Sequence, residues 1–148
     1  MKCKSVILAF VLILICAVSA VAASDATIDG HKFTIPDGYS LYNSSDDTVS
    51  LEKDDYHTIT IILGDAQNLD DARDNLENMG YNYSGSNSYK YGDFDVVQQN
   101  YELDGIVIYA YVCMSDKVNL IITLTAPKSE PALEGTDNPV TTILDTIN

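Results

Sequence analysis

The sequence predicts an α+β domain: a mostly antiparallel, curved sheet with two helices packed on it, preceded by an N-terminal signal helix. Three observations lead to this. Short β-branched segments alternate with turn residues, two segments carry apolar residues at helical spacing, and the chain opens with a charged and then apolar stretch. Its 148 residues suit one domain of about 100–150 residues. We therefore expect a signal over residues 1–23 and a single α+β domain over residues 24–148.

The first residues have the pattern of a secretory signal. Two lysines precede an apolar run over residues 6–18, and small residues follow, with plausible cleavage after Ala22 or Ala23. The alternative is an uncleaved anchor, although a spanning helix needs about 20 apolar residues. We expect a protein that is secreted or anchored at the outer face of the cell membrane. It would touch the membrane only through residues 1–23, and only if they are uncleaved.

Cysteine content and charge narrow the class of protein. Cleavage would remove Cys3 and Cys16 and leave Cys113, so no internal disulfide could form and a packed core must supply stability. Lys and Arg number 8 against 22 Asp and Glu, a formal charge of -14. That balance excludes a basic nucleic-acid-binding surface, since phosphate contacts need clustered cations.

Turn residues and β-branched residues together predict the strands. Asp29-Gly30 forms a two-residue hairpin turn between residues 27–28 and 32–35. Residues 48–52 and 57–63 form a second pair of strands, because β-branched residues favour the pleated backbone. The stretch over residues 94–126 is the strongest sheet signal and predicts a three-stranded meander.

Two segments have helical periodicity. Residues 68–79 are expected to form a helix capped by Asn68 and ended by Gly80. Residues 139–147 are expected to form the second, with Asn138 as its cap and Pro139 in its first turn. Their apolar stripes are Leu69, Ala72, Leu76 and Met79 in the first, and Val140, Ile143, Leu144 and Ile147 in the second.

A register follows if one face of the meander is apolar. A turn at Asp104-Gly105 puts Tyr101 opposite Ile108, and a three-residue turn over residues 115–117 puts Val112 opposite Leu120. Both helices would then cover the core face and leave the other face partly exposed. The core face would hold Ile106, Ile108, Ala110, Val112, Met114, Val118, Leu120, Ile122 and Leu124.

The order of elements resembles the PsbP-like α/β/α sandwich. The residues that carry the resemblance are a hairpin ending in 33–39 (FTIPDGY), a helix ending Met79-Gly80-Tyr81, the meander, and a closing helix that starts at residues 138–144 (NPVTTIL). The chain is also similar to small secreted proteins of unknown function in methane-producing archaea. The resemblance implies a fold and no particular activity, because this architecture hosts unrelated roles.

Motifs for metal binding and catalysis are weak. His31 and His57 lack ligand partners at metal-site spacing, and the acidic residues do not form a calcium-loop ladder. The sequence has no Gly-x-Ser-x-Gly elbow, and Cys113 falls in a predicted strand rather than at a helix start. Paired carboxylates for hydrolysis cannot be named among so many acids. We therefore assign no catalytic residue, metal or cofactor.

Tyrosine is the unusual residue type, with seven of the ten between Tyr81 and Tyr111. The predicted register gathers flat rings, amides and hydroxyls on one sheet face, a combination that suits sugar rings or polypeptide. The alternative is that the tyrosines have no binding role and are enriched here because aromatic residues are good strand formers. The candidate ligand-binding residues are Tyr109, Tyr111, Gln98, Asn100 and Thr123.

Two further motifs are glycosylation sequons at Asn43 and Asn82, which we expect in loops. Taken together, the sequence favours a secreted or cell-surface, non-catalytic binding domain whose partner is a cell-surface polymer or a protein. The alternatives are an extracellular hydrolase with paired carboxylates, or a structural envelope component whose edge strand pairs with neighbours.

Overall fold

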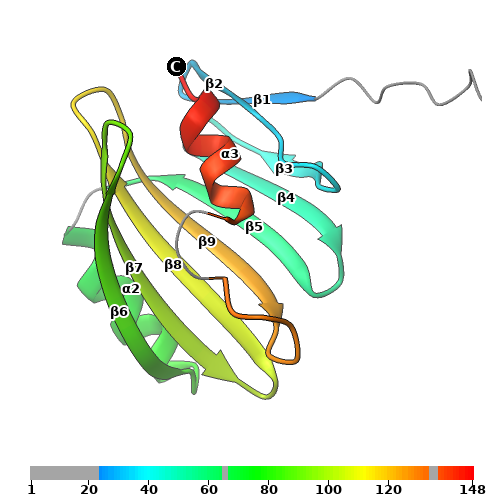
Figure 1. Cartoon of the computed structure of the whole chain (residues 1–148), viewed down its shortest axis with the longest axis vertical. Coiled ribbons are helices and arrows are strands. Elements are labelled where there is room, and N and C mark those ends of the chain that lie inside the picture. The colour runs from blue at the N-terminus through cyan, green and yellow to red at the C-terminus, as the bar shows by residue number, and fades with distance from the viewer. Residues whose placement is uncertain (1–23, 65–66, 134–136) are drawn as a thin grey trace, which may run out of the picture.

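The computed structural model describes residues 24–64, 67–133 and 137–148, with backbone only for residues 67–70 (Figure 1). The predicted signal over residues 1–23 lies outside this part of the chain. Among the described residues, no helix has the length and apolar character needed to cross a membrane.

Most of the chain forms one seven-stranded antiparallel sheet with strand order β3-β4-β5-β9-β8-β7-β6, and β1 and β2 form a separate hairpin. The predicted α+β class with mostly antiparallel strands is confirmed. The elements are β1 (Asp25–Ile28), β2 (His31–Thr34), β3 (Ser40–Ser44), β4 (Thr48–Asp54), β5 (His57–Leu63), α2 (Gln67–Asn78), β6 (Asn82–Tyr91), β7 (Phe94–Leu103), β8 (Ile106–Met114), β9 (Asn119–Pro127) and α3 (Pro139–Thr146).

Local chemistry produces the turns and helix ends that the sequence predicts. In the Asp29-Gly30 and Asp104-Gly105 turns all four residues have positive φ, as a primed hairpin turn requires. Asn138 caps α3, its side chain accepting a hydrogen bond from the Val140 N–H at 2.9 Å.

The end of α2 closes in a Schellman arrangement. Gly80 has φ 94, and the Tyr81 N–H donates to the carbonyl oxygen of Leu76. Leu76 and Tyr81 both pack on the sheet beneath the helix. The helix begins at Gln67, so Asn68 lies inside its first turn and is not the predicted cap. Met79, expected in the apolar stripe, is 67% exposed.

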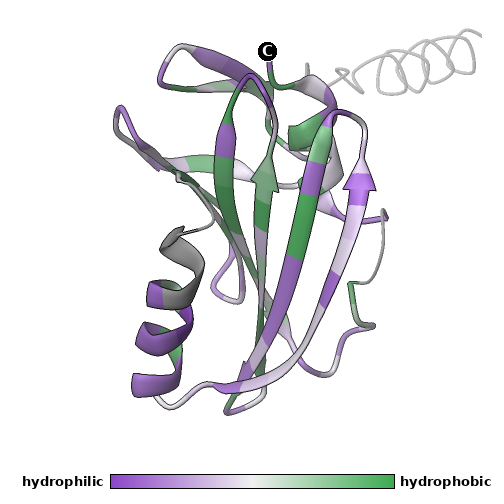
Figure 2. Cartoon of the chain, turned by 90° about the vertical axis from the view of Figure 1, so that its left-hand side faces the viewer, coloured by the Kyte–Doolittle hydropathy of each residue, from purple (hydrophilic) through white to green (hydrophobic). Residues whose placement is uncertain are grey.

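The two helices cover opposite faces of the sheet, which corrects the prediction that both cover one face. Figure 1 shows α3 in front of the sheet and α2 behind it. The α3 face carries the larger core, in which Ile143 of α3 and Phe33 of the hairpin pack with β4, β5, β9 and β8. The α2 face carries a small core of Tyr101, Ile108 and Ala110. Figure 2 shows α2 as mainly hydrophilic, in keeping with its short apolar contact.

The register of β8 with β9 differs by one residue from the prediction. Val112 pairs with Ile121, and Met114 with Asn119, so four residues connect the strands instead of three. The Ser115 hydroxyl fixes this turn, accepting from the Lys117 and Val118 N–H groups. Leu120, Ile122 and Leu124 therefore share a face with Tyr109 and Tyr111, not with Val112. The predicted pairing of Tyr101 with Ile108 is confirmed.

Neither edge strand was predicted from the sequence. β3 and β6 lie at the two ends of the strand order and carry few apolar residues. Asn43 lies within β3 and Asn82 begins β6, so the sequons lie in edge strands and not in the predicted loops. Both asparagines are exposed. Whether either is glycosylated stays a prediction.

Candidate functional site

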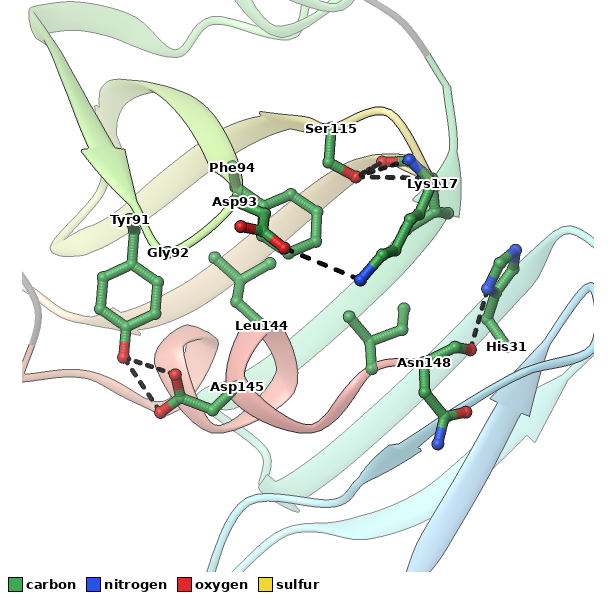
Figure 3. A pocket seen from close by; sticks show the side chains of 12 residues that line it. His31, Tyr91, Gly92, Asp93, Phe94, Ser115, Lys117, Leu144, Asp145 and Asn148 are labelled. Carbon is green, nitrogen blue, oxygen red and sulfur yellow. Dashed lines mark hydrogen bonds and ion pairs between the residues drawn. The ribbon is translucent and has the colours of Figure 1, made fainter.

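A cavity of about 290 Å³ opens where the β6–β7 turn, the β8–β9 turn and the end of α3 meet (Figure 3). Segments distant in the chain supply its walls. Its floor is apolar and consists of Phe94, Val118 and Leu144, all of which belong to the larger core. Its polar lining includes His31, Tyr91, Asp93, Ser115, Lys117, Asp145 and Asn148.

The turn between β6 and β7 brings an aromatic ring and a carboxylate to this cavity. Tyr91 pairs with Phe94 across the two-residue loop Gly92-Asp93, and Gly92 has φ 56, which favours glycine. This hairpin was not predicted from the sequence. It could have been, because Gly-Asp between two aromatic strand residues is a recognised hairpin pattern.

The Asp and Lys side chains that line the cavity are the carboxylates of Asp93 and Asp145 and the ammonium of Lys117. The Tyr91 hydroxyl donates to both carboxylate oxygens of Asp145, at 2.9 and 3.0 Å. Loss of hydration and then this hydrogen bond raise the pKa of Tyr91, so its phenol stays a donor. The Lys117 ammonium lies 3.7 Å from Asp93, and both side chains are largely exposed. Such a loose, exposed ion pair contributes little, so Lys117 can swing away.

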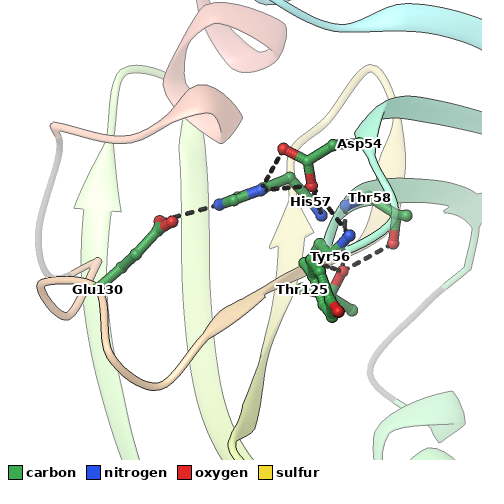
Figure 4. Close-up of polar contacts among 6 residues, drawn as sticks. All are labelled: Asp54, Tyr56, His57, Thr58, Thr125 and Glu130. Carbon is green, nitrogen blue, oxygen red and sulfur yellow. Dashed lines mark hydrogen bonds and ion pairs between the residues drawn. The ribbon is translucent and has the colours of Figure 1, made fainter.

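A second polar cluster centres on His57, on the side of the sheet where the segment after β9 crosses (Figure 4). Its Nδ1 lies 2.8 Å from Asp54 and its Nε2 lies 2.9 Å from Glu130. Asp54 is held in place because it also accepts the backbone N–H groups of Tyr56 and His57. Among the residues that the structure describes, no backbone N–H donates to the Glu130 carboxylate.

The two carboxylates shift the protonation of this cluster. The hydrogen bond to Glu130, and then that to Asp54, raise the pKa of His57. The hydrogen bond from His57 lowers the pKa of Asp54. The imidazole thus lies between the carboxyl groups of Asp54 and Glu130 and links two segments of the chain. With the imidazole between them, the two carboxyl groups hold two segments together, and no room is left for a substrate bond on which they could act as general acid and base.

The predicted ligand-binding residues are placed differently from expectation. Gln98, Asn100, Tyr109 and Tyr111 do share one sheet face, but it is the covered α3 face, where Gln98 is 3% exposed and Tyr109 is 5% exposed. Thr123 pairs with Ala110 and lies on the opposite face. The prediction that this face is exposed is therefore wrong. In the observed register the rings of Tyr109 and Tyr111 lie in the larger core with Ile122.

Tyr111 is the one buried side chain in the described part of the chain whose polar atom lacks a hydrogen-bond partner. It is fully buried, and loss of hydration raises its pKa. Tyr101, in the other core, contrasts with it, since its hydroxyl donates to Gln99 at 2.7 Å. A buried hydroxyl without a partner costs free energy.

Cys113 and the acidic residues show no further site in the described residues. Burial raises the pKa of the Cys113 thiol to about 12, which suits a small core residue rather than a nucleophile. Within residues 24–64, 67–133 and 137–148, no group of three or more His, Cys, Asp or Glu side chains is arranged to hold a metal ion.

Comparison with known proteins gives only a distant structural likeness. No family model matches the chain, and no curated protein matches it. A solved structure from Bacteroides thetaiotaomicron VPI-5482 is similar, with a TM-score of 0.47 and 14% identity. The match covers 82% of this chain and 46% of that chain, so this chain spans less than half of its length. Nothing in these comparisons bears on the PsbP-like resemblance, which stays a prediction.

The His57 cluster predicts a pH dependence of stability. Because the pKa of His57 is raised in the folded state, its contribution is complete below the unfolded value of 6.5 and is lost as pH rises through the folded value. Asp54, whose pKa is lowered, contributes above 3.8 and loses its contribution as pH falls through its folded value. Both contributions are complete between about pH 3.8 and 6.5. Urea unfolding from pH 3 to 9 should therefore give the highest free energy of unfolding in that range, and this maximum should depend on His57. A His57→Gln variant that lost stability equally at pH 5.5 and pH 9 would contradict this.

The two tyrosines give a matched pair of variants. Tyr111→Phe should leave the free energy of unfolding unchanged or raise it, because the removed hydroxyl has no partner. Tyr101→Phe should lower the free energy of unfolding by about 1 kcal/mol, because it breaks the bond to Gln99. Urea unfolding measures both, and a larger loss for Tyr111→Phe would show that its hydroxyl has a partner.

Proposed function

We propose that the chain is a non-catalytic binding domain, secreted or held at the outer face of the cell membrane, that binds a basic side chain of a protein partner in the cavity beside α3. The observation that carries this is the convergence of two carboxylates, an aromatic side chain and an apolar floor on one concave site. Concave sites with an apolar lining and a few convergent polar groups are where proteins usually bind ligands.

The charges at the cavity favour a cation. Asp93 and Asp145 oppose the single ammonium of Lys117, and the whole chain carries a formal charge of -14. Such a field draws positively charged groups and repels anions. A lysine or arginine stem can lie on the apolar floor while its head reaches the carboxylates, and the Tyr91 ring offers a further contact for a cation.

The location outside the cell rests on the sequence alone. The signal pattern over residues 1–23 supports export, and a strongly acidic surface suits a domain that must stay soluble there. A protein is favoured over a neutral polymer as partner, because a polymer of neutral sugars offers no positive group for the two carboxylates.

The test is a titration of the isotope-labelled protein with N-acetyl-L-lysine N-methylamide, followed by NMR. We expect shifts at residues 91–94 and 115–118. The glutamate analogue, with the same backbone and the opposite charge, should produce none. Lys117→Met should strengthen binding of the lysine probe roughly 1.4- to fivefold, because an exposed ion pair of about 0.2–1 kcal/mol no longer competes for Asp93.

The matched control is Lys53→Met, which makes the same change of net charge on β4, outside the cavity. Asp145→Asn should weaken binding of the same probe. An equal response to the two analogues, or equal affinities for Lys117→Met and Lys53→Met, would contradict the proposed site.

A further inference from the structure

The segment that follows β9 lies across the α3 face of the sheet, and we call Lys128–Leu133 the strap. The Lys128 N–H donates to the Gly105 carbonyl oxygen, and the Lys128 ammonium forms an ion pair with Glu102. The Glu130 carboxylate contacts the His57 ring. Every strap residue except Leu133 is exposed. With so little burial, the strap belongs to the part of the fold that opens at low free-energy cost.

The one half-buried strap residue is held through its backbone. The Leu133 N–H donates to the Tyr109 hydroxyl, and the Leu133 carbonyl accepts from the Gln98 side-chain amide, both at 3.3 Å. Its side chain packs against the larger core. Two buried side chains thus contact both polar backbone groups of a single residue, as a site for an extended peptide does.

Around Gln98, which bonds to the strap, there is hydrogen-bonding capacity that the strap does not use. Gln98 also donates to Asn100 at 3.0 Å, which orders the amide. Tyr111 is the cross-strand neighbour of Gln98, and its fully buried hydroxyl has no partner among the described residues. Buried polar groups are nearly always paired, so an unpaired one beside a backbone-contacting pair indicates a site built for a fuller ligand.

We propose that Gln98, Asn100, Tyr109 and Tyr111 form a recognition site for an extended polypeptide segment with an aliphatic side chain, and that the strap is an internal pseudo-ligand that occupies this site. A polypeptide is favoured because the occupant seen here is one, bound through its N–H, its C=O and a leucine side chain. The site is separate from the cavity beside α3, so either can fail without the other.

The test uses the strap's own sequence as the probe, the acetylated and amidated hexapeptide Lys-Ser-Glu-Pro-Ala-Leu. In the full chain, Leu133→Asp should drive the strap out of the site, because a carboxylate cannot replace the half-buried leucine that packs against the core. Isothermal titration should then show binding at least about tenfold tighter than to the matched control Ala132→Asp, because removing an internal competitor raises the competent fraction. Ala132 is exposed, so this control makes the same change of charge without displacing the strap.

Three further measurements keep the result interpretable. Glu130→Ala, an exposed change that removes the tie to His57, should give an intermediate gain in affinity. Adding Tyr109→Phe to Leu133→Asp should weaken binding about two- to tenfold, through loss of the bond to the peptide N–H. A hexapeptide ending in Asp should bind none of the variants. Equal affinities for Leu133→Asp and Ala132→Asp, or no binding by either Leu133→Asp or Glu130→Ala, would overturn the proposal.

Discussion

The register in which β8 pairs with β9 determines which side chains meet which helix. The connection between the strands is four residues long because the Ser115 hydroxyl accepts two backbone N–H groups and Asn119 accepts the Ser115 N–H. A shift of one residue would send the apolar residues of β9 to the other face. Because β8 is apolar on both sides, each face of the sheet needs cover, which α3 with the hairpin supplies on one side and α2 on the other.

Most of the fold follows from the sequence where backbone chemistry is local. The Asp-Gly turns, the Asn138 cap and the glycine after α2 were predictable because each depends on a few adjacent residues. The edge strands were not, because β3 and β6 have one neighbour each and need little apolar surface. The predicted register of β8 with β9 was wrong for another reason. A serine side chain closes the turn, and an alternation pattern cannot choose a face when both faces are buried.

The sites illustrate the same division. The sequence singled out Gln98, Asn100, Tyr109 and Tyr111 correctly as neighbours, since cross-strand pairing in β7–β8 follows from one turn. It could not show that the strap bonds to Gln98 and Tyr109, because these contacts depend on the path of an irregular segment. The cavity beside α3 was equally out of reach, since its walls come from a turn in mid-chain, another after β8, and the last helix. His57, too, gains its partners from two separate segments.

The most direct test of this account is the register itself, because it decides which tyrosines are covered and which face is left to α2. A carbon-edited NOESY spectrum of the protein should join the ring protons of Tyr111 to the methyl groups of Ile122, its cross-strand partner. Cross-peaks joining Tyr111 to Ile121 instead, together with Val112 to Leu120, would show the alternative register. The arrangement of the core, the strap and the site beneath it would then be wrong.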